Sequence, residues 1–115
     1  RQRVLRCVRA VEDLLDLGRL VPSDHVDATD AHLGPGYGRS TPESEEAIRL
    51  AGRHEGLLMD PVYTGKALAG MLSLARSGAL QGRPSVFVHT GGTPALFGYG
   101  APRAAATDLR GRHPD

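Results

Sequence analysis

Apolar side chains recur at every third or fourth position near the start of the chain, and charged side chains occupy the positions between them. The apolar positions are Val4, Val8, Val11 and Leu15. This spacing places them on one face of a helix, and Gly18 follows as a residue suited to end it. The pattern is already under way at Arg1, without an initiator methionine, a signal segment or a cap residue. We therefore expect the chain to be a piece of a larger protein.

Two further helices are predicted from their start and stop signals. Thr41 suits the N-cap position and Pro42 the first helical position, and glutamates follow where the helix dipole favours negative charge. This helix is expected to end at Gly56. The next is expected from about Gly65 to Ser77, because its apolar side chains fall on one side at helical spacing.

Two segments are predicted to be strands. Residues 25–30 alternate weakly between apolar and polar side chains, and Ser85–His89 has the pattern of a buried strand. A short helix is expected to follow and to run through Phe97. This order of elements predicts the α/β class, with an incomplete parallel sheet flanked by helices, because two strands are too few to complete a sheet. Residues 1–100 are expected to form part of one large domain, and residues 101–115 a loose tail.

Composition and charge exclude several classes of protein. At 115 residues the chain is at most one ordinary domain. Its 14 basic and 13 acidic side chains leave a net charge of +1, so no basic field indicates a nucleic-acid partner. Cys7 is the only cysteine, and no apolar run is long enough to span a membrane, so we expect a cytoplasmic protein. The five histidines show no ligand spacing, and we expect no metal site.

Two short blocks carry the candidate chemistry, and each places a hydroxyl side chain beside a glycine turn. The first block runs from Asp60 to Lys66, and the second from His89 to Gly92. One helix length and one strand length separate them, which is the span that returns a chain to the same end of a parallel sheet. The two blocks are therefore predicted to line one pocket.

Each block also has an ordinary structural interpretation. Tyr63 suits a phenol that exchanges a proton with a substrate, but it equally suits a half-buried aromatic side chain in a turn, with Thr64 capping the next helix. Thr90, Gly91 and Gly92 have the form of an anion or cofactor loop, or of a tight connection between strand and helix. The second block lacks the further glycine and acid of a dinucleotide fingerprint and the lysine of a P-loop.

Lys66 is the only lysine of the chain, and it is therefore the only residue here that can form a Schiff base. Its place in the first turn of a predicted helix favours a different environment. We expect a lysine that is solvated or paired with a carboxylate.

A resemblance to a known family is carried by five stretches of sequence: the glycine-rich run 34–38, the helix start at 41–48, the pair 55–56, the first block with Ala67, and the run 88–97. Together they closely resemble the C-terminal part of the D-cysteine desulfhydrase and 1-aminocyclopropane-1-carboxylate deaminase family. The likeness covers roughly residues 3 to 99. It implies a pyridoxal-phosphate enzyme of the tryptophan-synthase-β-like fold, called fold type II. The Schiff-base lysine and the phosphate loop of that family are expected upstream, so we expect this chain alone to be inactive and the full-length protein to be a homodimer.

The resemblance assigns roles to individual side chains. Tyr63 is similar to the active-site tyrosine that faces the substrate, and Tyr37 to a second tyrosine of the same pocket. The cofactor contacts implied are those of Thr90, Thr64, Gly91 and Gly92, with the Thr90 hydroxyl meeting the pyridine nitrogen. A neutral hydroxyl does not keep that nitrogen protonated as a carboxylate would, so the ring is a more moderate electron sink.

Two positions bear on the substrate. The deaminases usually carry Glu where this chain has Thr64, and an apolar residue where it has Thr90. Both departures favour D-cysteine desulfhydrase-like β-elimination, which releases pyruvate, ammonia and sulfide, with 1-aminocyclopropane-1-carboxylate deaminase as the alternative. A hypothesis of another class is a non-catalytic α/β module whose glycine turns bind a small anion or a protein partner.

Overall fold

A computed structural model describes residues 1–98 of the chain. These residues divide into two compact units, an N-terminal unit of residues 1–30 and a second unit that begins at Ala31. Of the predicted domain of residues 1–100, the last two residues lie outside the described part, and so does the predicted tail of residues 101–115. None of the helices in residues 1–98 has the length and apolar character needed to cross a membrane.

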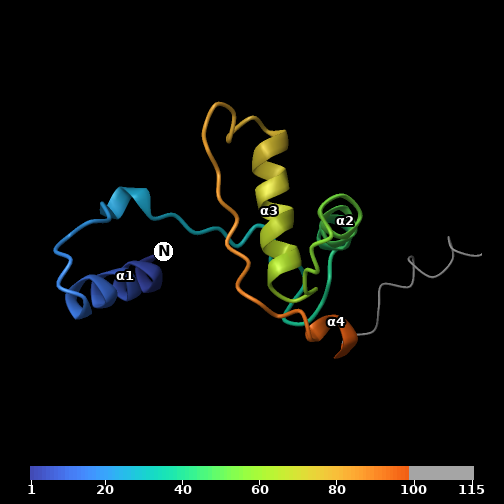
Figure 1. Cartoon of the computed structure of the whole chain (residues 1–115), viewed down its shortest axis with the longest axis horizontal. Helices are drawn as coiled ribbons and strands as arrows, with labels where there is room; N and C mark the ends of the chain where they lie inside the picture. The colour runs from blue at the N-terminus through green and yellow to red at the C-terminus, as the bar shows by residue number, and fades with distance from the viewer. Residues whose placement is uncertain (99–115) are drawn as a thin grey trace, which may run out of the picture. The chain divides into compact units, whose positions relative to one another are not determined.

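The N-terminal unit contains the helix α1 (Gln2–Leu14) and a short 3-10 helix (Ser23–His25), both visible in Figure 1. The prediction of α1 is confirmed, although the helix ends before Gly18. The weak strand predicted for residues 25–30 is wrong, because the chain there has no ladder partner and is irregular after the 3-10 helix.

The apolar stripe of α1 is largely exposed: Val11 is 52% exposed and Leu15 59%. The buried residue of this helix is Glu12. Its carboxylate accepts hydrogen bonds from the Arg9 guanidinium at 2.6 Å and from the backbone N–H of Val21 at 2.9 Å. The polar contacts of Glu12 therefore help to hold the chain that returns past this helix, in which Val26 is the buried apolar residue.

The second unit is built from helices. They are α2 (Pro42–Leu50), which continues into a π-helical turn (Ala51–Glu55), then α3 (Thr64–Arg76) and the short α4 (Ala95–Gly98). The predicted start of α2 is confirmed: the Thr41 hydroxyl accepts from the backbone N–H of Ser44, and the Ser44 hydroxyl accepts from that of Thr41. Gly56, at φ 65°, ends the π-helical turn in the left-handed conformation expected of a glycine stop.

The core of the second unit lies where α2 packs against α3 and the turn before it (Figure 1). The buried apolar side chains there are Ala47, Ala51, Met59, Val62 and Ala69. The two helices come close at Gly65, where a Cβ would lie 2.7 Å from the carbonyl oxygen of Asp60 and 2.8 Å from Ile48 Cγ1. A side chain at this position would separate the helices and move the first block.

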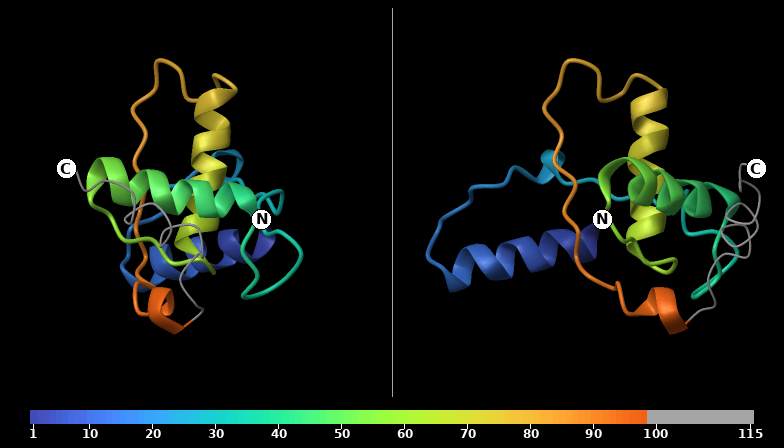
Figure 2. Two further views of the ribbon diagram at one scale, coloured as in Figure 1. Left: turned by 90° about the vertical axis from the view of Figure 1, so that its right-hand side faces the viewer. Right: turned by 45° about the vertical axis from the view of Figure 1, so that its right-hand side comes forward.

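The predicted α/β class is wrong for the part of the chain that the structure describes. Residues 1–98 contain helices and no strand. Ser85–His89, the predicted buried strand, forms no ladder, and its side chains Val86 and Val88 are 87% and 71% exposed. Figure 2 shows this segment as an irregular trace that runs back along α3. A strand needs a neighbouring strand to bond its N–H and C=O groups, and the described residues supply none.

Candidate active site

The buried carboxylate of Asp60 organises the turn that leads into α3. One oxygen, Oδ2, accepts from the backbone N–H groups of Val62 at 2.8 Å and Tyr63 at 2.7 Å. The other, Oδ1, accepts from the backbone N–H of Thr64 at 2.8 Å and from its hydroxyl at 2.6 Å. All four bonds go to the three residues that enter the helix. Asp60 therefore fixes the backbone conformation at Tyr63.

These bonds also set the ionisation of Asp60. Burial raises the pKa of the carboxyl, but the hydrogen bonds from the Thr64 hydroxyl and from the N–H groups of Thr64, Tyr63 and Val62 outweigh it. The net result is a pKa of Asp60 below its ordinary value. The carboxylate is thus held in its charged form inside the fold.

Two tyrosines from distant parts of the sequence meet at this turn. The hydroxyl groups of Tyr37 and Tyr63 lie 2.6 Å apart in a hydrogen bond, and their rings pack edge to face with centroids 5.9 Å apart. Both side chains are exposed, Tyr37 at 74% and Tyr63 at 57%. The hydrogen bond to Tyr63 raises the pKa of Tyr37. We call these two residues the tyrosine pair.

The second block lies against the first. Nε2 of His89 is 2.9 Å from the carbonyl oxygen of Leu58, just before Asp60, and the His89 Nδ1 atom accepts from the N–H of Gly91 at 3.1 Å. Gly92 lies on the Asp60 side chain, since a Cβ there would be 2.6 Å from Oδ1. The two blocks are thus in contact, through Asp60 and Leu58 rather than at the end of a sheet, and that they line one pocket stays a prediction.

Thr90 and Thr64 differ in their freedom to contact a ligand. Thr90 is exposed, and its hydroxyl makes no hydrogen bond within residues 1–98. The Thr64 side chain is buried, and its hydroxyl donates to Asp60 Oδ1 while accepting from the Asp60 N–H at 2.8 Å. The predicted cofactor contact of Thr64 therefore has no free donor in this structure, whereas that of Thr90 does.

Lys66 has neither of the two environments expected for it. The residue is only 7% exposed, and its ammonium donates to the backbone carbonyls of Leu33 and Gly36.

The organising role of Asp60 was not predicted from the sequence. The Asp-Pro pair before a helix was the available signal, because Asp commonly binds backbone N–H groups two to four residues ahead.

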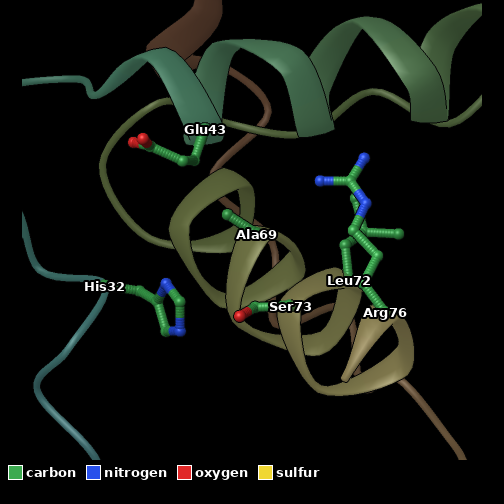
Figure 3. A pocket seen from close by; sticks show the side chains of 6 residues that line it. All are labelled: His32, Glu43, Ala69, Leu72, Ser73 and Arg76. Atoms are coloured by element: carbon green, nitrogen blue, oxygen red, sulfur yellow. The ribbon is translucent and has the colours of Figure 1, made fainter. Parts of the chain in front are cut away.

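A separate hollow lies between α2 and α3, at residues that carry none of the predicted chemistry (Figure 3). Its lining side chains are His32, Glu43, Ala69, Leu72, Ser73 and Arg76. In Figure 3 the Glu43 side chain comes from α2, the His32 ring comes from the chain before α2, and the other four side chains come from α3.

Within residues 1–98 no group of three or more His, Cys, Asp or Glu side chains is placed to hold a metal ion.

Replacing Gly92 by alanine is expected to lower the free energy of unfolding by about 2–3 kcal/mol, because the backbone sits at φ 91° and the new Cβ would collide with Asp60. Urea denaturation measures the loss. The matched control is Gly91→Ala, since Gly91 has a similar φ of 100° but open space at its Cβ position. Equal losses in the two variants would show that the contact with Asp60 contributes nothing.

Comparison with known proteins identifies similar sequences. The profile of the family described as "Pyridoxal-phosphate dependent enzyme" matches residues 5–91. A 1-aminocyclopropane-1-carboxylate deaminase of Methylobacterium sp. (strain 4-46) is 45% identical over 100 residues, which is 86% of this chain and 30% of that protein. A protein of the same name from Rhizobium leguminosarum bv. viciae is 43% identical over 100 residues, again 86% of this chain and 30% of the relative. The chain thus spans about 30% of the length of these curated relatives.

Proposed function

The chain belongs to the family of pyridoxal-phosphate-dependent enzymes, and on that basis we propose that it supplies one wall of the active site of an amino-acid lyase or deaminase. The rest of the site would come from the part of the family's domain that this chain does not span. We call the protein that joins both parts the complete enzyme. The observation that carries the proposal is the tyrosine pair. Its two residues are exposed and hydrogen-bonded to each other, and the Asp60 carboxylate that binds the Tyr63 N–H also lies against Gly92 of the second block.

The residues present fit one side of the cofactor. The Thr90 hydroxyl is exposed and free to meet a ring nitrogen, and the neighbouring Gly91 has open space where a Cβ would stand. The amine that forms the Schiff base with the cofactor is expected outside this chain. Lys66 is buried and its ammonium is bound to two carbonyls, so we assign that amine to the rest of the complete enzyme.

The tyrosine pair has a defined division of roles in this proposal. Either hydroxyl of the pair can be the donor in their hydrogen bond. We assign the proton exchange with the substrate to Tyr63 Oη, because the Asp60 carboxylate binds the Tyr63 backbone N–H and holds this residue in place. In this assignment Tyr37 donates to the Tyr63 oxygen and stabilises that oxygen after it has given up its proton. Bound pyridoxal phosphate supplies the electron sink that makes loss of groups next to the amino group possible.

The substrate proposed first is 1-aminocyclopropane-1-carboxylate. The support comes from the relatives, which are named for the deamination of this compound and are 40–45% identical across most of the chain. Ring opening with uptake of one water and release of ammonia would leave a four-carbon 2-oxo acid. Thr90 has an exposed hydroxyl without a hydrogen-bond partner among residues 1–98, and on the resemblance described above this favours a second candidate, D-cysteine desulfhydrase. Cytoplasmic location and assembly as a homodimer stay predictions.

A substrate comparison tests the proposal in the complete enzyme. With pyridoxal phosphate bound, we expect kcat/KM for the cyclopropane amino acid to exceed that for D-cysteine by about a hundredfold. Release of the 2-oxo acid, ammonia and sulfide measures the two reactions, and enzyme stripped of the cofactor is the control. The reverse order would replace the deaminase by the desulfhydrase. No turnover of either compound by folded, cofactor-loaded enzyme would contradict both.

A further inference from the structure

Lys66 is a buried cation whose charge meets no carboxylate in the described part of the chain. It lies in the first turn of α3 and is 7% exposed. Its Nζ atom donates to the carbonyl oxygen of Leu33 at 2.5 Å and to that of Gly36 at 3.2 Å. Hydrogen bonds from a charged donor are stronger than neutral ones. The Gly36 carbonyl also accepts from the backbone N–H of Arg39 at 3.3 Å, so Lys66 adds a charged donor to a turn that is otherwise held by one neutral bond.

Both acceptors belong to one loop, which we call the glycine loop (residues 33–38). Tyr37 is on this loop, immediately after the Gly36 carbonyl that Lys66 binds. The Tyr37 side chain is 74% exposed, and among residues 1–98 its hydrogen bond and its ring contact are both with Tyr63. Burial therefore does not hold Tyr37 in place. Its position depends on the backbone of the glycine loop.

Lys66 and Tyr63 both contact the glycine loop from the start of α3. They are three residues apart at the start of α3, one bonded to the loop backbone and the other to its tyrosine side chain. Asp60 sets the direction of Tyr63 through its backbone N–H. The loop also contacts the start of α2 at Gly34, where a Cβ would be 2.4 Å from the Thr41 methyl group. That contact lies three residues before Tyr37. The turn between Gly34 and Tyr37 is bonded to α3 through Lys66.

We propose that Lys66 is a positioning residue, whose buried ammonium holds the glycine loop on α3 so that Tyr37 keeps its hydroxyl against Tyr63. In this proposal the ammonium binds two backbone carbonyls and thereby orients the loop, and it does not bind a substrate or a cofactor. The expected effect on turnover rests on the proposed function. The claim that Lys66 holds the glycine loop is independent of that function, so each claim has its own test.

The first test measures how often the glycine loop opens, independently of catalysis. In the complete enzyme we expect Lys66→Met to speed trypsin cleavage after Arg39, next to the glycine loop, by roughly ten- to a hundredfold, because cleavage follows the opening of the loop. Mass spectrometry of the fragments measures the rate. The matched control is Arg76→Met, which removes a cation of the same helix that pairs with Glu46 instead. An unchanged rate in Lys66→Met, or an equal rise in the control, would overturn the proposal.

The second test asks whether Lys66 acts through Tyr37. We expect Lys66→Met to lower kcat by roughly ten- to a hundredfold in the complete enzyme, as a displaced active-site group does, and to have little further effect in a Tyr37→Phe background. General loss of structure would lower kcat equally in both backgrounds, and that result would reject the role of Lys66. If cleavage after Arg39 accelerates while neither tyrosine variant changes turnover, the loop proposal stands and the proposed function fails.

Discussion

Replacing Asp60 by asparagine is expected to lower the free energy of unfolding by about 2–5 kcal/mol. The carboxylate is fully buried and accepts four hydrogen bonds, two on each oxygen. An asparagine has one side-chain oxygen, and in place of the other it has an amide group that donates. Either orientation therefore leaves two of the four donors around residue 60 unpaired, at a cost of about 1–3 kcal/mol each. Urea denaturation of the chain measures the change. Asp24→Asn, at an exposed carboxylate, is the control and is expected to be neutral.

The same carboxylate predicts how stability depends on pH. Its pKa is below the ordinary value of 3.8 in the folded chain, so the folded state binds fewer protons than the unfolded state as the pH falls past that value. Its contribution is complete above about pH 5 and is lost as the pH drops below 3.8 towards the folded pKa. The difference between the chain and its Asp60→Asn variant should therefore shrink on acidification. A difference that is constant down to pH 2 would contradict the assignment.

Replacing Tyr63 by phenylalanine is expected to lower kcat of the complete enzyme by about a hundredfold to ten-thousandfold, the usual worth of a positioned proton donor or acceptor. The ring and its packing on Tyr37 remain, and only the oxygen that exchanges the proton is removed. Affinity for pyridoxal phosphate should change little, because Thr90 and the Gly91 turn are untouched. Stopped-flow turnover and cofactor titration measure the two quantities.

The control for Tyr63 is its own partner. Tyr37→Phe removes the neighbouring hydroxyl but leaves the proton-exchanging oxygen in place, so its loss in kcat should be smaller than that of Tyr63→Phe. It should also abolish most of the sensitivity to Lys66. Equal turnover in the Tyr63 variant and the unmodified enzyme would show that the phenol has no chemical role.

Helices were predictable from the sequence where local signals coincide. Thr41 and Pro42 predict the start of α2 from the hydrogen-bonding capacity of one hydroxyl and the geometry of one ring, and neither depends on distant residues. The apolar spacing after Gly65 likewise predicts α3. The apolar stripe of α1 predicts the helix but not its burial, because burial needs a partner surface that periodicity does not supply.

The predicted strand at Ser85–His89 fails for a related reason. A run of β-branched and aromatic side chains favours extended backbone, but a strand exists only when another strand bonds to it. Within residues 1–98 no such neighbour is available, and Val86 and Val88 are left exposed. A local preference was therefore insufficient to predict a structure that depends on long-range pairing.

Local sequence was sufficient to predict the positions of α2 and α3 and the residues of the two hydroxyl-glycine blocks, because caps, turns and helical spacing act over a few residues. Tertiary structure decided how those blocks are used. The Asp60 carboxylate joins Tyr63 to the Gly92 turn, and the Lys66 ammonium joins α3 to the loop of Tyr37. A buried charge takes whichever donors or acceptors the fold brings to it, and those partners stand up to 33 residues away along the chain.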